Sequence, residues 1–399
     1  MATTWPQSWP PAVAELHIFD PEGDVLFILT RSDDEESIKN YGEKKKPIII
    51  NIENDDGDAD HVETDLSEDC ATQPTMTSKI ISETDVHMRA SSKVLSLVSC
   101  VFNKMFGPDF KEGATLKSQG SVTIHLPDDD PDCLIILLNI IHGMTRKVPR
   151  GLENPDTLVG LATLIDYYQL HEVAELFSDG WLSARGGEDA REHVGYGCHH
   201  LLQDLWISWV FQDSSAFKDV MRSLILTGKE GFDDFKNPEM MQESIDRLPI
   251  PLAILELIKT RRDIAIKFCI SKFYQLLRKY NGPETCCESP FMDARSRMSC
   301  DAMVLGFLIK GAQQARIGPA PKKPKKPYKF SFESLASALR RIEVRSLCTE
   351  NSTGSPGTQD AHEVEAIIRG SVNAKDLAIR GYDLEISKFL PRGRKRMRE

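Results

Sequence analysis

The stretch Val86–Phe102, VHMRASSKVLSLVSCVF, decides the fold of the N-terminal part of the chain. It begins inside an extended segment, Lys79–Met88, which reads as one or two strands meeting at a polar turn. A helix follows from about Ser91, because apolar side chains recur there at the spacing of one helix face. These are Leu95, Val98, Phe102 and Met105. Gly107 and Pro108 end that helix.

The residues before and after this stretch predict further strands and helices. Upstream, Gly23–Thr30 is rich in β-branched and aromatic residues and predicts a buried strand. Downstream, Ser121–Leu126 alternates as a strand, and Asp130 caps a helix with Pro131 at its first position. Two more helices begin near residues 156 and 170. Strands gathered early and helices later predict an α+β domain with helices against a small mixed sheet.

The same residues resemble the signature of the BTB/POZ family. In Val86–Phe102 the resemblance lies in an apolar residue, a histidine, a leucine, a serine and a phenylalanine in that order. Four further segments follow in BTB/POZ order: Phe110–Gly113, Val122–Pro131, Leu137–Gly143 and Leu164–Leu170. The variant is most similar to the BTB/POZ proteins of filamentous fungi, and the resemblance covers about Leu16–Ser183. It implies a noncatalytic domain that binds other proteins.

An acidic segment interrupts this domain at residues 31–78. It holds 14 acidic and 5 basic residues, a net charge of −9, whereas the whole chain carries −11. It contains one aromatic residue, Tyr41, and one short apolar run, Ile48–Ile50. Such a segment cannot bury enough apolar surface to offset its ordering entropy, so we expect it to be mostly disordered. A solvated loop is the simpler interpretation, and mimicry of nucleic acid or recruitment of basic partners is the alternative.

The length of 399 residues predicts two domains with linkers. We expect a disordered N-terminus at 1–15, the BTB/POZ domain at 16–185 with its insert at 31–78, and a helical domain at 186–316. A linker of Pro and Lys at 317–330, a short helical region at 331–390 and a basic tail at 391–399 follow. The C-terminal half is mostly α-helical by its apolar spacing, as at Leu205–Phe211 and Ile254–Leu277.

Composition and termini point to an intracellular, soluble chain. The longest mostly apolar run, Cys133–Ile141, is interrupted by Asn139 and is far shorter than the roughly 18–20 residues needed to span a bilayer, so we expect no membrane partner. The N-terminal residues have neither the basic flank nor the apolar core of a secretion signal. Nine cysteines, an odd number, are typical of reduced thiols in the cytosol or nucleus.

Catalytic motifs are not found. No serine lies in a Gly-x-Ser-x-Gly pattern, and Gly228-Lys229 lacks the glycine that a phosphate-binding loop requires. His171-Glu172 and His362-Glu363 lack the second histidine of a zinc protease helix. The sequence therefore predicts no enzyme, no cofactor and no small-molecule substrate.

Cysteines and one histidine in the C-terminal half could in principle bind a metal. Cys286, Cys287, Cys300, Cys348 and His362 offer soft donors, and Cys198-His199-His200 is a second group. Zinc sites usually pair their ligands at short spacings, which these residues do not. The fungal relatives that the chain resembles have a His-x-Cys pair near His362, where this chain has Val364. We assign no metal site from the sequence, and reduced, partly buried thiols remain the simpler interpretation.

Two basic clusters stand out in the acidic chain. They comprise Lys322, Lys323, Lys325 and Lys326 between prolines, and Arg392, Arg394, Lys395, Arg396 and Arg398 at the end. Exposed positive charge of this density suits the acidic grooves of nuclear import receptors, or weak contacts with phosphates. A solvated tail is an equally good interpretation. The expected location is the nucleus, the cytoplasm or both.

The resemblance also implies a partner. BTB/POZ domains that act as substrate adaptors of cullin-type ubiquitin ligases carry an apolar-x-Glu motif after the helix that ends here at Gly107. Phe110 and Glu112 fit that motif. The short segment before the first strand leaves no room for the usual dimerisation helix, so a homo- or heterodimer stays open. We predict a protein-interaction protein, with a cullin adaptor as the first hypothesis and a nuclear regulator that uses the basic clusters as the alternative.

Overall fold

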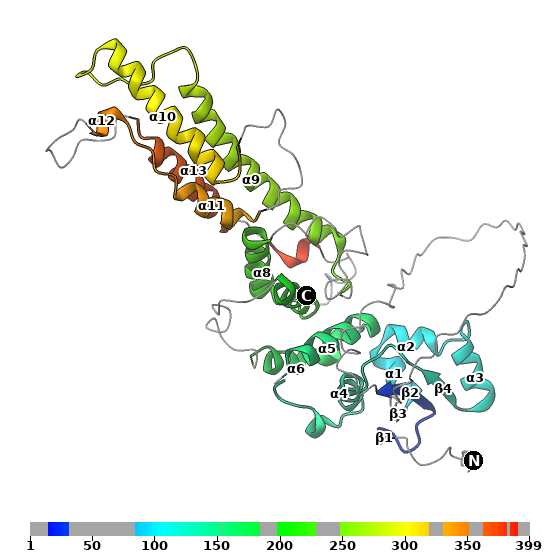
Figure 1. The fold of residues 1–399 in the computed structure, drawn as a ribbon. Coiled ribbons are helices and arrows are strands. Elements are labelled where there is room, and N and C mark those ends of the chain that lie inside the picture. The colour runs from blue at the N-terminus through cyan, green and yellow to red at the C-terminus, as the bar shows by residue number, and fades with distance from the viewer. Residues whose placement is uncertain are drawn as a thin grey trace, which may run out of the picture. The chain divides into compact units, whose positions relative to one another are not determined.

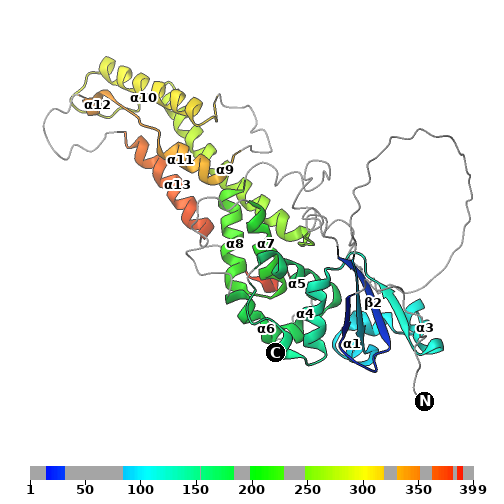
Figure 2. The same ribbon diagram turned by 60° about the horizontal axis from the view of Figure 1, so that its bottom comes forward.

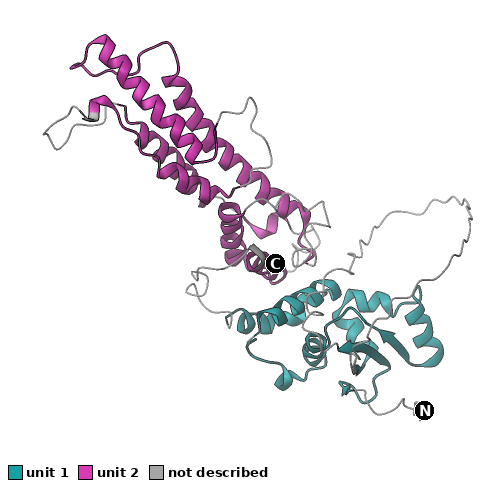
Figure 3. Cartoon of the chain, viewed as in Figure 1, with its two compact units in different colours: residues 1–185 teal, residues 186–399 magenta. Residues whose placement is uncertain are grey.

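The chain forms two compact units, Met1–Arg185 and Gly186–Glu399 (Figure 3). The structure is a computed structural model. It describes residues 15–31, 84–152, 154–183, 198–228, 248–318, 330–350, 362–380 and 384–389.

Unit 1 is built on a mixed four-stranded sheet (Figure 1). Its strands are β1 (Glu15–Ile18), β2 (Val25–Arg31), β3 (Thr84–Ala90) and β4 (Val122–His125). They lie in the order β1-β3-β2-β4, with β2 antiparallel to β3, and with the pairs β1–β3 and β2–β4 parallel. The expected α+β fold with a small mixed sheet is confirmed.

The buried faces of these strands explain their positions in the sheet. β2 lies between two neighbours, and its Val25, Phe27 and Leu29 are buried. In the sheet register Phe27 lies opposite Met88 on β3 and Ile124 on β4, and both are buried too. The strands expected at 23–30 and 121–126 are confirmed.

The extended segment before Ala90 was predicted as one or two strands meeting at a polar turn. Thr84–Ala90 is one continuous strand, and residues 79–83 lie outside the described part of the chain. Thr84 and Asp85 pair with Arg31 and Thr30 of β2, so the strand continues through the polar residues. β1 was not predicted, because four residues with two polar members carry little signal.

The helix predicted from Ser91 to Gly107 is wrong as a single element. The chain forms α1 (Ser92–Val98) and α2 (Cys100–Met105), which are separated at Ser99. The Ser99 backbone is extended, and its hydroxyl accepts a hydrogen bond from the Phe102 N–H at 3.1 Å. The same hydroxyl donates to the Tyr168 carbonyl at 2.6 Å. A buried serine that caps the second helix and ties it to a distant segment therefore breaks the helix.

The remaining helices of unit 1 follow their local signals. They are α3 (Lys111–Gln119), α4 (Pro131–Ile141), the 3-10 turn η2 (Thr145–Lys147), α5 (Pro155–Tyr168) and α6 (His171–Ser183). The Asp130 carboxylate accepts from the Cys133 N–H at 2.8 Å, and Pro131 is the first residue of α4, as predicted. Burial raises the pKa of this Asp130 carboxyl.

Aromatic side chains join the sheet to the helices. Phe102 of α2 stacks on Tyr168 of α5 with ring centroids 4.6 Å apart, and it lies 5.8 Å from Phe27 of β2. All three side chains are fully buried. The Tyr168 hydroxyl donates to the Asp129 carboxylate, so this polar group also has a buried partner. Helix α4 packs on β2 and β3, and α3 contacts β4.

The described part of unit 2 consists of helices joined by turns and irregular segments, and it contains no strand. Its helices are α7 (Cys198–Val210), α8 (Ser214–Thr227), α9 (Leu252–Tyr280), α10 (Ala294–Gln314), α11 (Phe332–Arg340), α12 (Leu347–Glu350), α13 (Val364–Arg380) and the 3-10 turn η5 (Ile386–Lys388). The long helix α9 contacts α8, α10, α11 and α13 (Figures 1 and 2). The helical character predicted for Leu205–Phe211 and Ile254–Leu277 is confirmed. Within the described residues, no helix has the length and apolar content to span a membrane.

Candidate functional site

The turn between α2 and α3 presents the two residues predicted to bind a partner. Phe110 is the N-cap of α3, in extended backbone geometry, and 51% of its side chain surface is exposed. Glu112 lies in the first turn of the same helix and is half-buried. A carboxylate at that position is favourable to the helix, because the exposed N–H groups there carry partial positive charge.

Backbone contacts hold this turn in one shape. The Gly107 N–H donates to the Lys104 carbonyl at 2.9 Å, and the Phe110 N–H donates to the Gly107 carbonyl at 3.3 Å. Gly113 packs directly on this turn, since a Cβ atom there would lie 1.9 Å from the Gly107 carbonyl oxygen. The backbone of the turn is therefore fixed, with Phe110 and Glu112 two positions apart in sequence at the start of α3.

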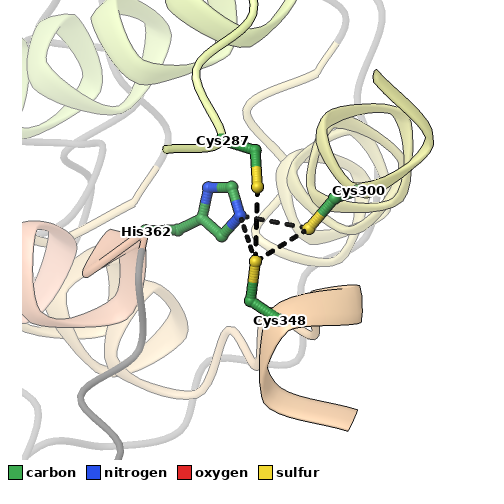
Figure 4. Close-up of side chains that lie close together, drawn as sticks. All are labelled: Cys287, Cys300, Cys348 and His362. Carbon is green, nitrogen blue, oxygen red and sulfur yellow. Dashed lines mark hydrogen bonds between the residues drawn. The ribbon is translucent and has the colours of Figure 1, made fainter. Parts of the chain in front are cut away.

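A second group of side chains with possible metal-ligand atoms lies in unit 2. Cys287 follows α9, Cys300 is in α10, Cys348 is in α12, and His362 comes directly before α13 (Figure 4). Their donor atoms all lie within 4.8 Å of one another. Cys348 Sγ is 3.3 Å from Cys287 Sγ and 3.5 Å from Cys300 Sγ.

The histidine completes this cluster. His362 Nε2 is 3.1 Å from Cys300 Sγ and 3.7 Å from Cys348 Sγ. On the other side of the ring, Nδ1 is 3.0 Å from the Tyr280 hydroxyl. Burial raises the pKa of the Cys348 thiol to about 12, with help from its hydrogen bonds to Cys287 and Cys300.

Comparison with known proteins identifies a family for one segment of the chain. The family model described as BTB/POZ domain matches residues 72–180. Residues 72–180 are a BTB/POZ domain. No curated protein and no solved structure matches the chain.

The BTB/POZ domain is a protein-interaction module, so this match supports protein–protein interaction as the function of unit 1. The family that matches is not a catalytic one. The matched segment includes Phe110 and Glu112, whereas the four residues of the Cys/His cluster lie beyond its end.

The other predicted sites fall outside the described residues. This applies to the basic cluster at Lys322–Lys326 and to the arginine-rich tail at 391–399. It also applies to nearly all of the acidic insert, of which only Arg31 is described. There, Arg31 pairs with Glu15 at 2.6 Å and with Asp132 at 2.6 Å.

The Cys/His cluster was considered in the sequence and set aside, because its members lack short spacings. Spacing along the sequence does not decide this question, because the fold brings together donor atoms from four separate segments. Cys286 was named with them but does not take part: its sulfur contacts the Lys279 and Glu284 carbonyls at 3.6 and 3.8 Å. Val364, at the position where relatives were expected to have cysteine, is fully buried at the start of α13.

Proposed function

We propose that the chain is a substrate adaptor of a cullin-type ubiquitin ligase, which binds the cullin scaffold through its BTB/POZ domain. The order of its motifs supports a place among the BTB/POZ proteins of filamentous fungi. Its role is noncatalytic: one surface holds the ligase scaffold, and the rest of the protein recruits the protein to be modified.

The exposure of Phe110 carries this proposal. A ring that is 51% exposed on a turn fixed by backbone hydrogen bonds is ready to enter a partner's pocket without reorganisation. Aromatic anchors that become fully buried are the residues that dominate binding energy at interfaces. Removing such an anchor costs about 2 kcal/mol or more, which corresponds to roughly a 30-fold loss of affinity.

Glu112 helps to fix the orientation in which a partner binds to this surface. The carboxylate lies two positions after the aromatic ring, and it can accept hydrogen bonds from a cationic or hydroxyl group of the partner. An apolar anchor beside one charged acceptor specifies an orientation, which an apolar patch alone does not.

The test uses the tagged full chain in its own cells, followed by mass spectrometry of the captured proteins. Cullin peptides should be present with the wild type and absent with the Phe110→Ala/Glu112→Ala variant. Binding of the purified variant to a purified cullin should be weaker by roughly 30-fold or more. Capture of cullin at equal levels by both proteins, or by neither, would contradict the proposal.

A matched control lies on α6 of the same unit. Glu175 and Leu176 are an exposed carboxylate and an exposed leucine next to each other, away from the turn between α2 and α3. The Glu175→Ala/Leu176→Ala variant should keep its cullin. Circular dichroism of both variants should match the wild type, because the substituted side chains lie on the surface or at its margin.

Dimerisation is a second interaction of this domain. BTB/POZ domains mediate protein interactions and dimerisation. β1 lies at one edge of the sheet, and its Leu16 and Ile18 are 46% and 47% exposed. Addition of a strand from a second copy would cover this edge. Light scattering of the purified chain measures the molar mass, and Leu16→Glu/Ile18→Glu should convert a dimer to a monomer.

A nuclear regulatory role is the alternative, and the two basic clusters in the sequence favour it. Replacement of Lys322, Lys323, Lys325 and Lys326 by Ala, with truncation of the tail after Pro391, should move a nuclear protein to the cytoplasm. Under the adaptor proposal, cullin capture from whole cells survives this change. Import receptors or chromatin proteins captured without any cullin would favour the regulator instead.

A further inference from the structure

We infer that Cys287, Cys300, Cys348 and His362 form a structural zinc site in unit 2. This inference is independent of the cullin proposal, because none of the four residues belongs to the matched BTB/POZ segment.

The spacing of the donor atoms matches one tetrahedral ion. Zn–S bonds of about 2.3 Å and Zn–N bonds of about 2.0–2.1 Å give tetrahedral edges of about 3.8 Å between sulfurs and about 3.5 Å between sulfur and nitrogen. The observed S···S distances of 3.3 and 3.5 Å and S···N distances of 3.1 and 3.7 Å lie close to these edges. Only small side-chain shifts are needed to place all four donors on one metal.

The donor set selects zinc. Three thiolates and one imidazole are soft donors, so hard cations such as Mg²⁺ and Ca²⁺, which prefer oxygen, are poor candidates. A tetrahedral arrangement of sulfur and nitrogen is typical of zinc or of iron–sulfur clusters. A cluster with bridging sulfides would hold its ligands further apart than one ion does, whereas all four donors here lie within 4.8 Å.

Burial indicates a structural rather than a catalytic ion. Cys287, Cys300 and His362 are at most 7% exposed, and Cys348 is half-buried. Figure 4 shows the three sulfurs and the imidazole nitrogen pointing toward one another. Four protein donors fill the coordination sphere of zinc, so no position remains for a reactive water.

The surroundings hold the ligands in place. The Tyr280 hydroxyl on His362 Nδ1 leaves Nε2 to face the sulfurs, which is the arrangement that a metal-binding histidine requires. Next to Cys287, the Cys286 N–H donates to the Asp301 carboxylate at 2.6 Å, and Asp301 adjoins Cys300. The loop after α9 is thus attached to α10 at the point where each contributes a ligand.

A disulfide explains the cluster less well. The Cys287–Cys348 sulfurs are 3.3 Å apart, whereas a disulfide bond is about 2.05 Å long. A disulfide between Cys287 and Cys348 would also not explain why Cys300 and His362 lie in contact with each other. One ion accounts for all four side chains together.

The site would join parts of the unit that are far apart along the chain. Cys287 and Cys348 are 61 positions apart, and Cys300 and His362 are 62 positions apart. The short helix α12 contacts α10 beside the cluster. A shared ion fixes this helix and the start of α13 against the end of α9, and its binding energy becomes folding energy.

The experiment measures metal in the full chain. The protein is expressed in zinc-containing medium, purified without chelators and analysed by mass spectrometry for metals, with about one zinc per chain expected. X-ray absorption at the zinc edge should show three sulfurs at about 2.3 Å and one nitrogen at about 2.0 Å. Cys300→Ser and His362→Ala should lose the zinc, and Cys286→Ser is the matched control that should keep it.

A conservative variant separates loss of metal from loss of folding. His362→Cys should retain zinc with four thiolates, and its cobalt-substituted form should show shifted d–d absorption bands that remain tetrahedral in intensity. A purified wild-type chain without zinc, or with a Cys287–Cys348 disulfide in place of the metal, would overturn the inference. Zinc that persists unchanged in both Cys300→Ser and His362→Ala would also overturn it.

Discussion

The Nε2 atom of His362 lies 3.1 Å from the sulfur of Cys300, although 62 positions of chain separate the two residues. The imidazole is held between this sulfur and the Tyr280 hydroxyl, which is 3.0 Å from Nδ1. Tyr280 is the last residue of α9, and its ring packs against that of His362 with centroids 5.7 Å apart. The orientation of the histidine therefore depends on a residue that is not one of the four donors.

Tyr280→Phe should weaken zinc binding without abolishing it. The phenyl ring keeps the packing on His362 but removes the hydroxyl partner of Nδ1, and loss of such a partner typically lowers metal affinity by about 10- to 100-fold. The measurement is a competition titration against a coloured chelator. The zinc content of the variant purified in excess zinc should still equal that of the wild type.

Tyr274→Phe is the matched control for this prediction. Tyr274 is also a buried tyrosine of α9, but its hydroxyl donates to the Ile317 carbonyl, away from the cluster. Its zinc affinity should equal that of the wild type. Equal affinities for all three proteins would show that Tyr280 does not position His362.

Removal of zinc should loosen unit 2 and leave unit 1 unchanged. A strong chelator takes away the link between the loop after α9, α10, α12 and the start of α13, so backbone hydrogen exchange should accelerate around Cys287, Cys348 and His362. Exchange in α5 of unit 1 should not change. Equal exchange in both units with and without chelator would argue against a structural ion.

The sequence predicted most of the fold of unit 1 because its signals are local. The Asp130 cap, the proline after it and the alternation that predicted the strand at 121–126 each depend on residues within a few positions of one another. The break at Ser99 could not be foreseen, because it depends on the Tyr168 carbonyl, 69 positions away. Helix α3 was missed for a different reason: KEGATLKSQ has no strong apolar face, and its placement comes from the close contact of Gly113 with Gly107.

The candidate sites show the same limit. Phe110 and Glu112 could be named from the sequence, because the BTB/POZ adaptor motif that they resemble is a single short segment. The four residues of the Cys/His cluster could be listed but not joined, because spacings of 61 and 62 positions carry no signal of contact. Only the packing of α9, α10, α12 and α13 brings them together.

Gly113→Ala should destabilise the BTB/POZ domain and weaken cullin binding together. A Cβ atom at this position would lie 1.9 Å from the Gly107 carbonyl oxygen and 2.6 Å from that of Phe106, so α3 must move away from the turn. Overpacking of this kind costs about 1–3 kcal/mol of unfolding free energy, which urea denaturation measures. The displaced helix carries Phe110 with it.

A second glycine gives the opposite expectation. Gly370 lies on the exposed side of α13, and a Cβ atom added there would have no neighbouring atom within 4 Å. Gly370→Ala should therefore raise stability by about 0.5–1 kcal/mol through helix propensity.

Unchanged stability in Gly113→Ala would mean that the turn between α2 and α3 adapts easily. In that case the turn would not hold Phe110 in one position for binding.

Arg262 is a buried cation that joins three segments of unit 2. Its side chain is fully buried in α9, and its Nε donates to the Gly228 carbonyl, at the end of α8, at 2.8 Å. One terminal nitrogen donates to the Phe330 carbonyl, before α11, at 3.1 Å, and the other lies 3.5 Å from the Asp263 carboxylate. The bond to the Gly228 carbonyl is buried and the bond to the Phe330 carbonyl is part-buried, so water can replace the arginine only poorly at the first of these carbonyls.

Arg262→Met should lower the unfolding free energy of unit 2 by about 3 kcal/mol, because methionine fills a similar volume but leaves two backbone carbonyls without this donor. Urea denaturation, followed by fluorescence and fitted with separate transitions for the two units, measures the loss. Arg278→Met, on the exposed surface of α9, is the matched control, with an expected change below about 0.5 kcal/mol. If the two variants are equally stable, hydrophobic packing alone holds α8 and α11 on α9, and the buried arginine is not needed for that arrangement.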